Sequence, residues 1–177
     1  MKNLQKAGGI SAIIAAATYI FAMALVASLL MPMIDSSLGF QEFMTFLAAN
    51  KLLIFVWHFS MYLINGVCLT VLALALYERL KEDSPRLAKT ATIFGLLWTS
   101  FVFLSGLITL YGTEVVISLY EKNQTNAENL WLAINTVTLG IDSSDKLLGC
   151  LRVGLVSLAD YKSRAFPRVA NLFGLAI

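Results

Sequence analysis

The polar side chains that could do chemistry in this sequence are few, and they lie inside apolar stretches. His58 is the only histidine, and Arg152 interrupts the apolar run of residues 147–159. Asn65 follows His58 by seven residues, so the two side chains share a face if the segment is helical. An imidazole can move a proton or bind a metal ion, and a guanidinium can bind an anion. We therefore take Arg152, His58 and Asn65 as the candidate ligand-binding residues.

The residues around His58 limit this chemistry. No aspartate, glutamate or second histidine lies at a similar depth in its apolar stretch, and a metal site would need such partners. The two cysteines, Cys68 and Cys150, form no CxxC pair, and no HExxH motif, nucleophile elbow or phosphate loop occurs. We therefore expect no catalytic residues, no metal site and no cofactor. An enzyme that acts on a lipid, with His58 as its base, is an alternative.

Arg152 has three interpretations, because a charge in the middle of a bilayer is unfavourable by at least about 2.5 kcal/mol. It could bind an anionic ligand, or it could pair with a carboxylate of another helix or subunit. It could also reach the membrane surface if its helix crosses only shallowly. Asp145 and Asp160 lie on roughly the same side of a helix as Arg152. Each is displaced by about 10 Å or more along the axis, which is too far for a direct pair.

The composition of the chain indicates a membrane protein. Of its 177 residues, 58% are hydrophobic and 14% are charged, whereas soluble domains carry about 25% charged residues. Three stretches, 7–34, 52–77 and 90–113, contain no charged side chain, and each exceeds the roughly 20 residues that a helix needs to cross a bilayer. A net charge of +2 without a basic cluster gives no reason to expect nucleic acid as a partner. The predicted fold is an all-α membrane helical bundle.

We expect a single transmembrane domain over residues 1–177 with about four crossings, and 169–177 as a truncated fifth span or a short interfacial tail. Residues 40–47 form either a short surface helix or the first turns of the second span. The polar stretch 113–145 is expected to be a loop with a short amphipathic helix, because Thr125 and Glu128 fit a capping box. Ser84 and Pro85 mark the start of the third span. The four predicted spans are 7–31, 52–77, 87–111 and 146–161.

Small residues on the first span predict a packing surface. Gly8, Ala12 and Ala16 recur at every fourth position, and small residues let helices approach closely in lipid. The expected partners are therefore the lipid bilayer and, through this face, a second copy of the chain or another membrane protein.

Basic residues indicate how the chain threads through the membrane. They gather before the first span, between the second and third, and after the fourth, all on one side if four crossings are real. Since positive residues are retained in the cytoplasm, the N-terminus is predicted to be cytoplasmic. The basic residues concerned are Lys2, Lys6, Arg79, Lys81, Arg86, Lys89, Lys162, Arg164 and Arg168.

The chain resembles a family of small bacterial multi-pass membrane proteins of unknown function. The similarity covers nearly the whole chain and is carried by apolar spans and helix ends, at residues 6–10 (KAGGI), 72–81 (LALALYERLK), 91–98 (ATIFGLLW) and 129–133 (NLWLA). The resemblance implies a helical protein of the bacterial inner membrane and implies no activity. Members of that family continue past the position of Ile177 with apolar sequence and are uncharged around Arg152.

Two functions from different classes follow. The first is a non-enzymatic multi-pass membrane protein that packs with itself or with another membrane protein. The second is a small transporter or channel subunit, in which Arg152, Asn65 and Thr99 would face one polar cavity near the middle of the bilayer.

Overall fold

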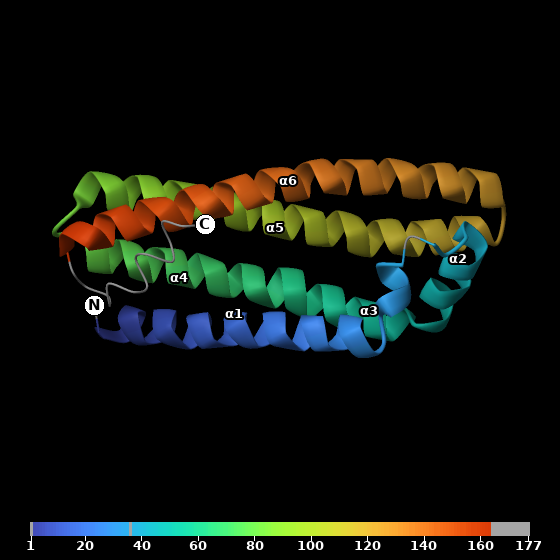
Figure 1. Ribbon diagram of the computed structural model, residues 1–177, viewed down its shortest axis with the longest axis horizontal. Coiled ribbons are helices and arrows are strands. Elements are labelled where there is room, and N and C mark those ends of the chain that lie inside the picture. The colour runs from blue at the N-terminus through green and yellow to red at the C-terminus, as the bar shows by residue number, and fades with distance from the viewer. Residues whose placement is uncertain (1, 36, 164–177) are drawn as a thin grey trace.

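Four long helical rods lie side by side and alternate in direction along the chain (Figure 1). The computed structural model describes residues 2–35 and 37–163, and every regular element in these ranges is helical. The fold class predicted from the sequence, an all-α membrane helical bundle, is confirmed. The predicted partial span 169–177 lies outside the described residues. The rods are α1 (Lys2–Ser28), the continuous α3–η2–α4 (Lys51–His58, Phe59–Ile64 and Asn65–Leu80), α5 (Pro85–Tyr120) and α6 (Gln124–Ser163).

Three of these rods are long and apolar enough to cross a membrane, namely α1, Lys51–Leu80 and α5. They correspond to the first three predicted spans, with α5 extending beyond its predicted end. At 1.5 Å per residue the 36 residues of α5 rise about 54 Å, which exceeds a hydrocarbon core of about 30 Å. The fourth rod, α6, has 40 residues but is much less apolar. The predicted span 146–161 is the second half of this helix.

The expectation of a polar loop over residues 113–145 is wrong. Helix α5 continues to Tyr120, a turn of three residues follows, and α6 starts at Gln124. The backbone N–H of Asn126 donates to Asn123 Oδ1 over 3.0 Å, so Asn123 caps α6 in place of Thr125. The two helices extend this far because Val116, Ile117 and Ala127 are buried together at their ends, and tertiary packing overrides a polar local composition.

Two short elements close the end of the bundle that lies opposite the chain's N-terminus (Figure 1). They are η1 (Met31–Met33), which contains Pro32, and α2 (Phe40–Ala49). Helix α2 is separated from α3 by Asn50, whose backbone leaves helical geometry with φ −116° and ψ 23°. Of the two interpretations of residues 40–47, the separate helix is therefore confirmed. Met44 and Leu47 of α2 are buried against the ends of α3 and α5.

The second rod changes its helical pitch near its middle. Residues Phe59–Ile64 form a π-helical segment, η2, between the α-helical halves α3 and α4. Such wide turns are rare and are frequently found at functional sites. This segment holds Tyr62 and directly follows His58, so both aromatic rings lie where the helix is irregular.

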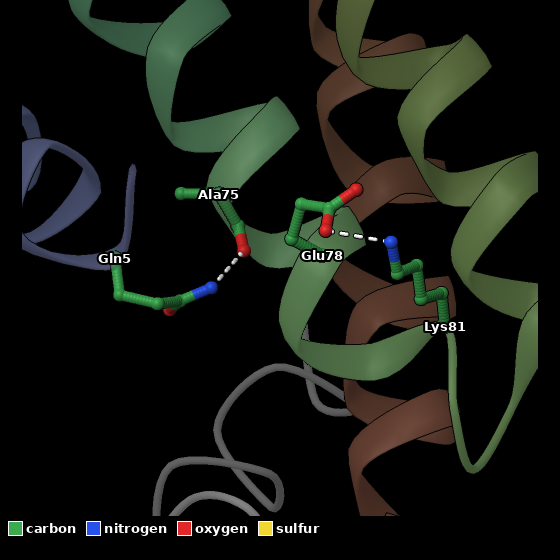
Figure 2. A network of polar contacts seen from close by, with 4 residues as sticks. All are labelled: Gln5, Ala75, Glu78 and Lys81. Atoms are coloured by element: carbon green, nitrogen blue, oxygen red, sulfur yellow. Dashed lines mark hydrogen bonds and ion pairs between the residues drawn. The ribbon is translucent and has the colours of Figure 1, made fainter. Parts of the chain in front are cut away.

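The contact between α1 and α4 uses only Gly8 of the predicted packing face, and packing of that face against a second copy or another membrane protein stays a prediction. Gly8 lies against Ala75, and a Cβ added at Gly8 would overlap the Ala75 side chain. The Gln5 side chain donates to the Ala75 carbonyl over 2.9 Å, as Figure 2 shows beside the Glu78–Lys81 ion pair of 2.6 Å. Ala12 is only half-buried and Ala16 is exposed. The buried positions of α1 instead alternate in steps of three and four, at Gly8, Ser11, Ala15, Thr18 and Ala22.

The period of the α-helix explains why the buried positions of α1 differ from the predicted four-residue spacing. A strict four-residue step advances about 40° past each full turn, so the face it marks winds away from a neighbouring helix. Alternating steps of three and four stay in contact with a partner that crosses at about 20°. Gly8 belongs to both patterns, which is why it alone of the three predicted residues lies in the contact.

We predict that Gly8→Leu destabilises the bundle by about 1–3 kcal/mol, because the added side chain has no room against Ala75. Gly9→Leu is the matched control, since nothing lies within 4 Å of a Cβ at Gly9. Thermal unfolding of both variants in detergent measures the difference. Equal melting temperatures for the two variants would show that α1 does not pack here.

Candidate functional site

Polar side chains gather in the middle of the bundle, between two apolar clusters at its ends. One apolar cluster is built around Leu30, Met44 and Ile54, and the other around Leu80 and Ala88. Between them lie buried polar residues from all four rods, of which Asn65 pairs with Thr18 and Ser105 with Asp142. They are Thr18, His58, Asn65, Thr99, Ser105, Thr138 and Arg152. We call this region the polar centre, together with the half-buried Tyr62, Trp98, Asp142 and Asp145.

Helix α6 contributes a polar stripe to this centre. Thr138, Asp142, Asp145, Gly149 and Arg152 recur at alternating steps of four and three, which keeps them on the side of α6 that meets α5. On α5 the matching positions run in the opposite direction, in steps of seven, seven and three residues. Four pairs define the register: Gly112 with Ile134, Ser105 with Asp142, Trp98 with Gly149, and Gly95 with Arg152.

Asp142 is held by α5 and approached by η2. The Ser105 hydroxyl donates to Asp142 Oδ1 over 2.7 Å. Tyr62 lies close enough to Ser105 and Asp142 to interact with both electrostatically. Tyr62 comes this close because Gly106 of α5 has no side chain where the tyrosine Cβ lies. Three elements, η2, α5 and α6, therefore meet at this carboxylate.

Asp145 lies one turn further along α6 and is less well satisfied. Its Oδ1 is buried and makes no hydrogen bond among the residues that the structure describes. The Trp98 indole interacts with the Asp145 carboxylate, although neither Trp98 Nε1 nor Asp145 Oδ1 reaches full hydrogen-bond geometry in the described part of the chain. Tyr19 of α1 lies within the field of Asp145. The two buried groups therefore satisfy each other only weakly, whereas most buried polar atoms are fully hydrogen-bonded.

Arg152 points into the bundle, with only 4% of its surface exposed. Its guanidinium carbon lies 5.3 Å from the centre of the Trp98 ring, a cation–π distance. Its stem lies over Gly95, where a Cβ would come within 2.9 Å of Arg152 Nε. Nη2 has no hydrogen-bond partner within residues 2–35 and 37–163. The Arg152 side chain also lines a small cavity of about 10 Å³, together with Ala73, Ala91 and Val156.

This geometry decides between the interpretations of Arg152. A surface-reaching side chain is wrong for the described chain, because Gly95 leaves space for the guanidinium inside the bundle. No carboxylate of the described residues forms an ion pair with it, so a pair within the chain is also not found there. Anion binding and pairing with another subunit stay as predictions.

His58 and Asn65 are both buried but do not converge. His58 Nδ1 lies 2.8 Å from the Ile54 carbonyl oxygen, and the ring packs between Trp57 and Tyr62. Asn65 donates to Thr18 Oγ1 of α1 over 3.2 Å, while its Oδ1 has no partner among described residues. The π-helical segment between them removes the common face that a seven-residue spacing gives in an α-helix.

The contacts of His58 and Thr99 give little support to His58 as a base or to Thr99 as a residue that lines a polar cavity. A cavity of about 60 Å³ beside His58 is also lined by Thr113 and Glu114. Yet no hydrogen bond joins the imidazole to a carboxylate or hydroxyl in the described ranges. The Thr99 hydroxyl donates to the Gly95 carbonyl of its own helix over 2.9 Å. Among the described residues, no group of three or more His, Cys, Asp or Glu side chains could hold a metal ion.

Sequence reasoning missed Asp142, Asp145, Tyr62, Ser105 and Trp98 as members of the centre. It placed residues 113–145 outside the membrane, so both aspartates were interpreted as turn residues. The available signal was the alternation of three- and four-residue steps from Thr138 to Arg152. That pattern predicts one continuous helix with a polar stripe.

The arrangement defines a class of protein, an all-α membrane helical bundle with a polar interior. Residues 7–177 match the family described as "Domain of unknown function (DUF4386)", and the chain belongs to this family. The match covers nearly the whole chain and assigns no activity. No curated protein and no solved structure matches the chain.

We predict that Ser105→Ala destabilises the bundle by about 0.6–1.7 kcal/mol, the usual range for an interhelical hydrogen bond in a membrane protein. The change removes the donor to Asp142. Ser100→Ala is the control, because the exposed Ser100 hydroxyl donates only to Leu96 of its own helix. Denaturation in mixed detergent micelles measures both variants, and an equal loss for the two would contradict the assigned α5–α6 register.

We predict that Arg152→Met leaves the free energy of unfolding unchanged or raises it. An unpaired buried charge is unfavourable, and an apolar side chain of similar length removes that penalty. The same denaturation experiment tests this. A loss of 3 kcal/mol or more, on the order expected when a buried ion pair is broken, would show that Arg152 has a charged partner in the folded protein.

Proposed function

We propose that this protein is a small transporter or channel subunit whose polar pathway follows the interior face of α6. The single observation that carries the proposal is the set of ionisable side chains that α6 directs into the bundle, Asp142, Asp145 and Arg152, of which Arg152 Nη2 has no hydrogen-bond partner in the described chain. Ionisable groups inside a membrane bundle are unfavourable, and they usually mark ion or substrate pathways. A protein that only packs against a partner has no need of them in its interior.

The proposal includes α6 as a fourth crossing. Helix α6 lies along α5 over its length (Figure 1), and its register with α5 runs from Gly112 to Gly95, within a rod apolar enough to span the membrane. A helix with a polar stripe can cross a bilayer when that stripe faces the bundle interior. The pathway differs from the one expected from the sequence, since Asn65 and Thr99 do not line a cavity with Arg152.

The same proposal places the protein in a bacterial inner membrane with its N-terminus in the cytoplasm. The start of α1, the α4–α5 turn and the end of α6 lie at one end of the bundle (Figure 1). Lys2, Lys6, Lys81, Arg86 and Lys89 belong to this end, and positive residues are retained on the cytoplasmic side. The end that carries α2 then faces outward.

Thiol accessibility tests the pathway without knowledge of the solute. In a background without Cys68 and Cys150, single cysteines at Ser105 and Ser157 report on the buried interior. We expect both to react with a charged, membrane-impermeant methanethiosulfonate reagent in sealed vesicles, because the reactive thiolate exists only where water reaches.

The matched controls are Leu104→Cys and Leu158→Cys, each adjacent in sequence but exposed on the outside of the bundle. In lipid these thiols stay protonated and should not react. If the interior cysteines are as unreactive as the lipid-facing ones, from both sides of the membrane, the polar centre is a dry structural contact and the proposed function is wrong.

A further inference from the structure

A cleft of about 400 Å³ opens at the end of the bundle that carries α2. Its walls come from the segment between α1 and α2, from α2 itself and from the first turns of α6, which meet at this end (Figure 1). The volume is within the range of sites for small organic ligands, about 300–1,000 Å³. The cleft is separate from the polar centre, because no residue lines both.

Aromatic rings form one part of the lining. Phe43 of α2 and Trp131 of α6 pack together with ring centroids 5.1 Å apart, and both line the cleft. Phe40, a third lining residue, packs edge-on against Tyr120 at 5.8 Å. All three rings are only half-buried. Contacts with α5 and α6 therefore fix the rings, and part of each stays open to a ligand.

Oxygen atoms form the polar part of the lining. Asp35, from the segment before α2, and Glu128, from α6, contribute carboxylates, and Asn135 contributes an amide. Both the backbone N–H and the hydroxyl of Ser37 donate to Asp35 Oδ1, over 2.9 Å and 2.6 Å. These bonds lower the pKa of the Asp35 carboxyl, so it is charged at neutral pH. No lysine or arginine of the described residues lines the cleft.

We propose that this cleft binds an organic cation of the quaternary ammonium class. Aromatic faces attract such cations through their quadrupoles, and nearby carboxylates supply the opposite charge. An anion would meet two carboxylates and no basic side chain, and a neutral apolar ligand would leave both carboxylates unused. A small inorganic cation would need several converging oxygen ligands and would make no use of the rings.

Calorimetric titration of the full chain, purified in an uncharged maltoside detergent, tests the site with choline as the probe. We expect saturable binding. The neutral isostere 3,3-dimethylbutan-1-ol should bind at least about five-fold more weakly, since it has the same shape without the charge. Equal binding of the two compounds would overturn the proposal. It would also be overturned if neither choline nor dihexanoylphosphatidylcholine, a short-chain lipid with a choline headgroup, bound saturably.

Charge-removing variants locate the site. Glu128→Gln and Asp35→Asn should each weaken choline binding by at least about five-fold. Both residues are exposed, so neither change should disturb folding. Glu42→Gln is the control, because Glu42 is an exposed carboxylate of α2 that does not line the cleft. An equal effect of Glu42→Gln would show general charge attraction in place of a site.

The same cation could arrive as a free solute or as the headgroup of a lipid. Dihexanoylphosphatidylcholine, kept below its micelle concentration, distinguishes the two, with dihexanoylphosphatidylglycerol as the control of equal chain length. Tighter binding of the choline ester than of choline identifies a headgroup site, and tighter binding of choline identifies a solute site. The cleft and the α6 pathway are tested separately, so either proposal can fail without the other.

Discussion

The antiparallel contact between α5 and α6 is the constraint on which the rest of the structure depends. It fixes which residue of α6 meets which residue of α5 over several turns, from Gly112 and Ile134 to Gly95 and Arg152. The glycines of this contact leave space that side chains of the facing helix fill. Gly149 receives the Trp98 ring and Gly95 receives the Arg152 stem. Because each residue turns the side-chain direction by about 100°, a shift of one residue in α6 would move Asp142 and Arg152 out of the interior together.

The polar centre is stable only because apolar packing closes the bundle at both ends. Leu30, Met44 and Leu47 seal one end, and Leu80 and Ala159 seal the other. Hydrophobic association is weak between helices in lipid, so the close contacts of small residues such as Gly8 and Gly66 supply much of the remaining attraction. The bundle can therefore tolerate a few unsatisfied groups in its middle, since the end clusters and the close contacts of small residues stabilise it.

The sequence predicted the fold class and the three helices that are long and apolar enough to cross a membrane, because uncharged stretches longer than 20 residues admit few other structures. It failed over residues 113–145, where charges and hydroxyl groups are common. Polar content was interpreted as exposure to water, whereas α6 directs Thr138 and Asp142 toward α5. A single chain cannot distinguish a polar stripe that faces water from one that faces a bundle, since both give the same period. The burial of Arg152 depends on the missing side chain of Gly95, a feature of the partner helix that local sequence does not reveal.

The wide turn of η2 allows the two halves of one rod to aim at different neighbours. Each residue in an α-helix advances the side-chain direction by about 100°, and a π-helical segment interrupts this regular advance. Before η2 in the chain, α3 directs Ile54 toward the apolar end cluster formed with α2 and α5. After η2, α4 directs Asn65 toward α1. In a rod of uniform pitch the angle between Ile54 and Asn65 would be set by the regular advance of the residues between them. The irregular turn changes that angle, so the two halves of the rod present these side chains in directions that a regular helix would not give.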